Sequence, residues 1–589
     1  MRQNQSSSCG RPVARPPRHC HRNPGTLDCP APRRSATTAA EAGSGRHPSG
    51  HDQVRPMAPD SFPAPRRGAA VLRPIPLLLA LGLLACGADD GALPTPSATA
   101  SSPQGTGAPP TTEQESTPTS DRQSTATSGP RPSTPVTTGQ PSGEPSGEPA
   151  CTRRPVRLGD SDATLALAED PAACGAPEYR WLDPAGLAEI TATGRSGAFP
   201  AALLAAALRA EDITPPEPPR LDTQWRVVTY TTQDRGVPVE ATTLLAWSRD
   251  VDPGAPVLLL LHGTSGFTDG CGTALELGWQ ALAAYFASLG YVVVAPDYIG
   301  LRMDDEETGF PHPYLAGEPT AIASLDAVRA GLAHLDAVAP ALCPSQDVVI
   351  LGASQGGHAA LWVDRLAAHY APELELLGTV ATVPPADLLA QLRPALLERI
   401  SATGNTLAFL ATTPFWYGLG DRLAEALVAP FDEDIPAALQ EGCSTSRLVR
   451  SLPDDIEEIF QAPLLEAARA GLDELARLEP WGCLASVNSL TRTTIPRIVE
   501  DADHYGILWV LGEQDELVDS GLSRRSAEQL CADGTPVALI ECEGSNHTRA
   551  TYHALPEIQS FLRDRADRQP FQAAAGCSFP PAARCANSP

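Results

Sequence analysis

Short, wholly apolar segments alternate with longer helix-like segments over much of this chain, and this alternation most limits how it can fold. The apolar runs occupy residues 257–261 (VLLLL), 291–295 (YVVVA), 348–351 (VVIL), 507–511 (ILWVL) and 537–540 (VALI). Helical patterns lie at residues 278–289, 320–335, 356–370, 521–531 and 555–565. Strands that are apolar on both faces are typical of a parallel sheet covered by helices on both sides. The pattern predicts an α/β fold with a mostly parallel central sheet.

Two regions depart from this alternation. Residues 224–232 and 237–247 are rich in β-formers and are joined by Asp234-Arg235-Gly236, which predicts a hairpin ahead of the parallel strands. Residues 385–500 hold long helical patterns such as LLAQLRPALLERI and no strand of the same kind. We interpret this stretch as a helical cap over one end of the sheet, the alternative being helices that only extend the core. The core then comprises residues 220–384 and 501–570, with an accessory segment at 151–219 and a tail at 571–589.

The N-terminal part has the organisation of an exported protein. Residues 57–85 contain arginines followed by an apolar run at 75–85, whose 11 residues are too few to span a bilayer, for which roughly 20 are needed. The run ends in Leu-Leu-Ala-Cys, which resembles a bacterial lipobox and implies a lipid on Cys86. An ordinary secretion signal is the alternative. Residues 1–56 precede this signal, so we expect translation to start at Met57. Residues 86–150 are rich in Ser, Thr, Pro and Gly, which predicts a disordered linker.

Charge and cysteine content restrict the function further. The formal net charge of −27 argues against a nucleic-acid partner. Apart from Cys86 and the three cysteines before Met57, ten of the fourteen cysteines remain, and an even count in an exported chain predicts disulfides. Spacing does not decide their pairing; the sequence neighbours Cys531–Cys542 and Cys577–Cys585 are guesses. No CxxC cluster indicates a metal site.

The segment after the third apolar run reads Gly352-Ala353-Ser354-Gln355-Gly356, a G-x-S-x-G motif between a strand and a helix. In this setting the tight turn exposes the serine hydroxyl at the carboxyl edge of the sheet. Bulky side chains at either glycine would collide with the neighbouring strand and helix. We therefore expect Ser354 to be a nucleophile.

A serine nucleophile needs a base, and the base needs an orienting carboxylate. Asp515 follows the strand at 507–511 and is the candidate acid, with Glu513 and Asp519 as neighbouring alternatives. His547 lies on the loop after the last strand, at 537–540, and is the candidate base. The other histidines near these elements are less suited by position: His358, His504 and His553.

The tetrahedral intermediate of acyl transfer needs two donors for its oxyanion. One donor should be the backbone N–H of Gln355, the residue after the nucleophile. The other should come from the loop after residues 257–261, which reads His262-Gly263-Thr264. Thr264 or Gly263 is the candidate, and His262 shapes the loop.

These motifs resemble the α/β-hydrolase superfamily, and within it the secretory lipase family of fungi and actinobacteria. The resemblance rests on LLLLHGTSG, YVVVAPDYIGL, HPYLAGEPTAIASLDAVRA, GASQGGHAAL and the loops of Asp515 and His547, and it covers about residues 224–565. Ala353 stands where the family motif more often has tyrosine. The resemblance implies an α/β-hydrolase fold with a helical lid, and hydrolysis of carboxylic esters or acylglycerols without a cofactor.

The sequence thus predicts an exported serine esterase or lipase, attached to the cell envelope through Cys86 or secreted. Two other functions fit the same residues: a serine peptidase or acyltransferase on this fold, and an inactive binding module of the envelope. Neither the acyl chain length nor the oligomeric state can be read from the sequence.

Overall fold

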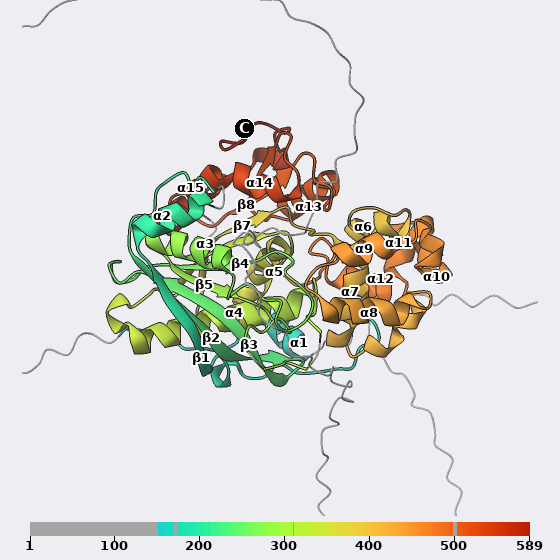
Figure 1. Cartoon of the computed structure of the whole chain (residues 1–589), viewed down its shortest axis with the longest axis horizontal. Coiled ribbons are helices and arrows are strands. Elements are labelled where there is room, and N and C mark those ends of the chain that lie inside the picture. The colour runs from blue at the N-terminus through green and yellow to red at the C-terminus, as the bar shows by residue number, and fades with distance from the viewer. Residues whose placement is uncertain are drawn as a thin grey trace, which may run out of the picture. The chain divides into compact units, whose positions relative to one another are not determined.

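The computed structural model describes residues 151–588 except 170–172, 211–212, 305, 310 and 499–502. Its centre is a nine-stranded mixed sheet with the order β1-β2-β3-β5-β4-β6-β7-β8-β9 (Figure 1). The expectations for residues 1–150, including the upstream extension, the signal sequence, the linker and lipid attachment at Cys86, lie outside the described residues.

The sheet is antiparallel at one end and parallel over the rest. Neighbours among β1, β2, β3 and β5 pair antiparallel, whereas neighbours among β5, β4, β6, β7, β8 and β9 pair parallel. This arrangement confirms the predicted α/β fold and hairpin. The bounds are β1 Ile190–Phe199, β2 Thr223–Asp234, β3 Val237–Trp247, β4 Val257–Leu261, β5 Val292–Pro296, β6 Asp347–Ala353, β7 Glu375–Thr382, β8 Ile507–Gly512 and β9 Val537–Cys542.

Helices cover both faces of the parallel strands, which is why β4 and β5 are apolar throughout. One core cluster joins the sheet to α4 (Gly317–Val338), α5 (Gln355–Tyr370) and α13 (Ser520–Ala532). A second cluster joins the opposite face to α2 (Ala201–Ala210), α3 (Leu277–Ser288) and α15 (Leu555–Ala566). The predicted helices of the core are therefore present, with ends shifted by up to three residues.

Two strands were not anticipated from the sequence. β7 reads ELLGTVAT, in which a charge, a glycine and two threonines interrupt the apolar run that marked the other parallel strands. β1 reads ITATGRSGAF and is largely exposed, because it lies at the edge of the sheet beside β2. Both strands are recognised only through their partners: β1 pairs with β2 at the edge of the sheet, where a strand need not be apolar, and β7 pairs with β6 and β8.

Residues 385–498 form a group of helices, seen in yellow and orange in Figure 1. They supply most of a third hydrophobic cluster, which also includes Phe267, Tyr314 and Leu315 from the rest of the chain. Within this part of the described chain the only β-pairing is an isolated bridge between Leu427 and Phe460. The helices are α6 Leu388–Leu392, η3 Arg393–Leu396, α7 Thr403–Trp416, η4 Gly420–Glu425, α8 Phe431–Glu441, α9 Ser446–Ser451, η5 Ile456–Glu458, α10 Ala462–Ala470, α11 Leu472–Ala476 and α12 Trp481–Val487. We call this group the cap.

The ten cysteines of the described chain form five disulfides: Cys151–Cys343, Cys174–Cys483, Cys271–Cys443, Cys531–Cys577 and Cys542–Cys585. The guessed pairs Cys531–Cys542 and Cys577–Cys585 are wrong. Cys531 belongs to the core on the α13 face of the sheet, whereas Cys542 belongs to the core on the α15 face. Sequence neighbours are thus separated by the sheet, and each bonds to the C-terminal tail on its own side.

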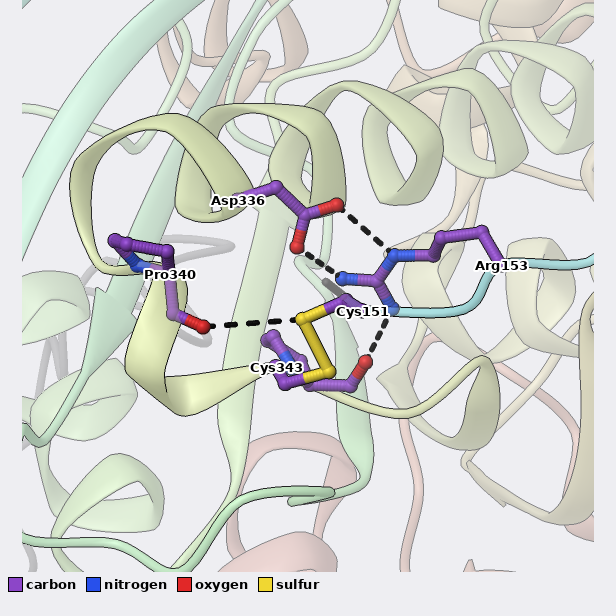
Figure 2. Close-up of a disulfide and its surroundings, with 6 residues drawn as sticks. Cys151, Arg153, Asp336, Pro340 and Cys343 are labelled. Atoms are coloured by element: carbon purple, nitrogen blue, oxygen red, sulfur yellow. Dashed lines mark hydrogen bonds and ion pairs between the residues drawn. A yellow bond between two sulfur atoms is a disulfide. The ribbon is translucent and has the colours of Figure 1, made fainter. Parts of the chain in front are cut away.

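The first described residues are bonded to the end of α4 and to the segment between α4 and β6. Cys151 is bonded to Cys343, and the Arg153 guanidinium forms an ion pair with Asp336 at 2.5 Å and donates to the Pro344 carbonyl (Figure 2). β6 starts at Asp347, so this attachment lies at the amino end of the parallel strands. Cys151 therefore lies near the amino ends of the strands, opposite their carboxyl ends. None of the described helices has the length and apolar character needed to cross a membrane.

Candidate active site

Ser354 occupies a strained turn between β6 and α5. Its φ of 57° and ψ of −118° are unusual for a residue with a side chain, and its N–H donates to the Thr382 carbonyl of β7 at 2.9 Å. The flanking glycines are required by contact. A Cβ on Gly352 would lie 2.0 Å from the Gly356 carbonyl oxygen, and a Cβ on Gly356 would lie 2.1 Å from the Leu261 carbonyl oxygen. The predicted crowding at both glycines is confirmed.

The carboxyl ends of the strands bring Ser354 together with His547 and Asp515. His547 Nε2 lies 2.9 Å from Ser354 Oγ. On the other side of the ring, His547 Nδ1 lies 2.9 Å from Asp515 Oδ1 and 2.8 Å from Oδ2. The side chains of His547 and Asp515 are 3% and 1% exposed, so water hardly competes for these hydrogen bonds.

The loop around Asp515 fixes how its carboxylate faces the histidine. Asp515 Oδ1 accepts the backbone N–H groups of Leu517 at 2.9 Å and Val518 at 2.8 Å. The Glu516 carboxylate accepts the N–H of His547 at 3.2 Å, which ties the two loops together. A carboxylate has no proton to give, so His547 Nδ1 is the donor and Nε2 keeps a lone pair directed at Ser354.

The alternatives considered for the acid and the base make other contacts. Asp519 caps α13 by accepting the Leu522 N–H, and Glu513 accepts the Gly544 N–H. His553 is bonded to Ser545 Oγ, and His358 Nε2 lies 2.9 Å from the Asn488 carbonyl of the cap. His504 precedes β8, at the other end of that strand.

One detail of the prediction for His547 is wrong. This residue does not sit within a loop but begins the short helix α14, His547–His553. The Asn546 side chain caps α14 by accepting the Arg549 N–H, and this cap ends the loop after β9 just before the histidine.

The predicted oxyanion donors lie at the ends of two adjacent strands, β4 and β6. Among the described residues, the N–H groups of Gly263, Thr264 and Gln355 have no hydrogen-bond acceptor. The absence of a side chain at Gly356 lets the loop after β4 approach the first turn of α5. These free donors therefore belong to two backbone segments in direct contact, as an oxyanion site requires.

His262 supports that loop from inside the protein. It is fully buried, its Nδ1 lies 2.6 Å from the Gly263 carbonyl oxygen, and burial lowers its pKa to about 4. The ring is therefore neutral near pH 7, and it lies against the loop that follows β4.

Three polar side chains near this loop were given no role from the sequence. The Tyr314 hydroxyl lies 2.9 Å from Thr264 Oγ1 and accepts a hydrogen bond from the Asn405 amide of the cap at 2.8 Å. His312 contacts the Gln355 side chain. His312 and Tyr314 belong to the HPYLAGE segment, and the only available signal was two polar aromatic residues directly before a buried helix. Within the described chain, no group of three or more His, Cys, Asp or Glu side chains is arranged to hold a metal ion.

Comparison with known proteins agrees with this fold. Residues 279–408 match the family model of the secretory lipases, and no curated protein sequence matches the chain. A putative hydrolase from Legionella pneumophila is 20% identical, with a TM-score of 0.53 over 64% of this chain and 98% of that one.

Two further solved structures are similar. The ligand-bound rice cell wall degrading esterase LipA from Xanthomonas oryzae is 20% identical, with a TM-score of 0.50 over 64% of this chain and 97% of its own. Candida antarctica lipase A is 16% identical, with a TM-score of 0.50 over 68% of this chain and 87% of its own. The chain thus has the α/β-hydrolase fold, and its residues 279–408 carry the sequence pattern of the secretory lipase family.

Proposed function

We propose that this protein is a serine hydrolase of carboxylic esters, an esterase or lipase. The single observation that carries the proposal is the continuous hydrogen-bond chain from Asp515 through His547 to Ser354 at the carboxyl edge of the sheet. A serine hydroxyl is a weak nucleophile by itself, and this chain provides the base that activates it.

The geometry supports a two-step acyl transfer. Ser354 Oγ attacks the ester carbonyl while His547 Nε2 takes its proton, and Asp515 stabilises the resulting imidazolium. The N–H groups of Gln355 and of Thr264 or Gly263 stabilise the oxyanion of the tetrahedral intermediate. His547 then gives its proton to the leaving alcohol, and the acyl-enzyme forms. Water, activated by the same histidine, releases the acid and restores Ser354.

Similarity to known proteins and the apolar cap both support an ester substrate. The match to the secretory lipase model, and the similarity to an esterase and a lipase, favour esters over amides. The cap adds a large apolar cluster beside the site, suited to the acyl part of an ester or acylglycerol. A panel of esters, amides and acceptor alcohols separates hydrolysis from peptidase or acyltransferase activity.

Turnover of p-nitrophenyl butyrate by the wild type and by Ser354→Ala tests the proposal. We expect the variant to lose at least about 10³-fold in kcat, because the remaining site has no nucleophile. The matched control is Ser324→Ala: this buried serine of α4 donates to the Thr320 carbonyl, lies outside the proposed site and should keep the wild-type rate. A fluorophosphonate probe should label the wild type and the control but not Ser354→Ala. Equal rates for wild type and Ser354→Ala would refute the mechanism.

The location forms part of the proposal. Five disulfides in the described chain indicate an oxidising compartment outside the cytosol. Attachment to the envelope through a lipid on Cys86 is supported by the lipobox-like sequence. Labelling with a palmitate analogue should mark the wild type and not Cys86→Ser, and labelling of both would exclude Cys86 as the lipid site.

A further inference from the structure

His312 touches both backbone segments that hold the proposed oxyanion donors. Its N–H donates to the Phe267 carbonyl, in the loop after β4, at 3.0 Å. Its ring Nε2 lies 2.6 Å from the side-chain Nε2 of Gln355, the first residue of α5. The residue is fully buried, so both contacts are shielded from water.

The direction of the contact between His312 and Gln355 follows from the other ring nitrogen. His312 Nδ1 lies 2.8 Å from the Ile299 carbonyl oxygen, which can only accept, so Nδ1 carries the proton. In a neutral imidazole Nε2 is then an acceptor, and the Gln355 amide donates to it. Burial keeps the ring neutral, since it lowers the pKa of His312 to about 3.

The His312 ring has little freedom to move. It is stacked on Tyr298, with ring centroids 5.9 Å apart and planes 15° from parallel. Tyr298 in turn lies against His262 and donates its hydroxyl to the His262 carbonyl at 3.0 Å. Gly300, at φ +78°, makes room for this layer, because a Cβ there would lie 2.7 Å from the His312 backbone nitrogen.

Gln355 depends on this contact. Its Oε1 is buried without a partner among the described residues, so His312 provides the only hydrogen bond to its side chain there. Gln355 comes directly after the strained Ser354 and is the first residue of α5, so its backbone N–H makes no intrahelical hydrogen bond. The direction of that N–H is therefore set by the turn on one side and by the anchored side chain on the other.

We propose that His312 is a positioning residue for ester hydrolysis, which holds the Gln355 donor at a fixed place relative to the loop of Gly263 and Thr264. This inference rests on the proposed function and extends it. A donor fixed before the reaction stabilises the transition state without a cost of reorganisation, whereas a donor that can shift is worth less.

Two single variants and their combination test this role. His312→Phe keeps a flat ring on Tyr298 but removes the acceptor, and Gln355→Leu removes the side-chain donor while keeping the backbone N–H. We expect each to lower kcat for p-nitrophenyl butyrate by about 10- to 100-fold, the effect of a misplaced catalytic group. KM should change less than about 3-fold, because the donors act mainly in the transition state. The double variant should lose no more than either single one.

Further measurements separate positioning from a general loss of structure. A trifluoromethyl ketone forms a tetrahedral adduct with an oxyanion on the serine, so its inhibition constant should rise in parallel with the loss of kcat. His312→Gln restores an acceptor for Gln355 and should recover part of kcat.

The matched control is His369→Phe at the other end of α5. His369 is also buried and has both ring nitrogens bonded, to Thr164 Oγ1 and the Pro496 carbonyl. This variant should lower the melting temperature but keep kcat.

The outcomes distinguish this inference from the proposed function. If the wild type hydrolyses the ester and His312→Phe or Gln355→Leu keeps kcat, or if their effects add fully, the positioning role is overturned while the hydrolase remains. A wild type that cleaves no ester overturns both. Should His312→Phe not fold, Gln355→Leu still decides, because it leaves the buried histidine in place.

Discussion

Replacing Asp515 by asparagine should convert the histidine to the wrong tautomer while leaving the fold intact. Asp515 Oδ1 accepts the N–H groups of Leu517 and Val518, so the asparagine oxygen must take that position. Its NH₂ group then occupies the place of Oδ2, which lies 2.8 Å from His547 Nδ1. A proton on Nδ1 would then face an NH₂ proton across this short distance, so Nδ1 must accept, and the ring proton moves to Nε2, where it blocks proton transfer from Ser354.

The size of the loss in kcat follows from the cost of a wrong histidine tautomer. A misassigned tautomer in such a triad costs about 10³- to 10⁴-fold in kcat, or about 4–5.5 kcal/mol of transition-state stabilisation. The free energy of unfolding should change by less than about 1 kcal/mol, because the two backbone hydrogen bonds are kept. Initial rates with p-nitrophenyl butyrate at pH 7.5 and urea unfolding measure the two quantities.

The control is the same chemical change four residues away. Asp519→Asn replaces one good helix cap by another, because Asp519 accepts the Leu522 N–H at the start of α13. It should keep its rate within about twofold and its stability within about 0.5 kcal/mol. The reasoning fails if Asp515→Asn keeps more than a tenth of the wild-type kcat, or if Asp519→Asn loses as much as Asp515→Asn.

Three further perturbations have defined outcomes. Gly356→Ala places a Cβ 2.1 Å from the Leu261 carbonyl oxygen, so it should cost about 2–3 kcal/mol of stability and at least tenfold in kcat; wild-type melting and rate would contradict this. Replacing both Cys542 and Cys585 by serine removes a disulfide that links residues 43 positions apart, and calorimetry should show a loss of about 4 kcal/mol in the free energy of unfolding. An unchanged free energy would contradict this. Burial lowers the pKa of His358 to about 4, below its unfolded value near 6.5, so its contribution is present above pH 6.5 and is lost as pH falls towards 4. Between pH 7 and pH 5 the unfolding free energy of His358→Gln should therefore fall by about 2 kcal/mol less than that of the wild type. An equal fall in both proteins would exclude this cause.

The sequence limited the fold and the candidate site because both depend on local patterns. Continuous apolar runs such as residues 257–261 can be buried only between two helical layers, and this requirement leads to the parallel sheet. The carboxyl ends of parallel strands share one edge, so Ser354, Asp515 and His547 could be assigned to one place from their positions after successive strands. The glycines around Ser354 carried the signature of a tight turn, and their contacts show why.

The strand β7 and the disulfide pairing depend on contacts between segments that are far apart in the sequence. β7 was missed because its interrupted pattern becomes a strand only between β6 and β8. The disulfides could not be paired from spacing, because the sheet separates Cys531 from Cys542.

The sequence by itself determined the fold class and the residues available for the chemistry, since strand burial and turn geometry are set by near neighbours along the chain. The tertiary structure decided which polar groups meet. It brought His312 to Gln355, 43 residues apart, and Asn405 of the cap to Tyr314, 91 residues apart. Such contacts form only when separate elements pack together, because the hydrogen-bonding capacity of a buried side chain is satisfied by whatever the fold places beside it.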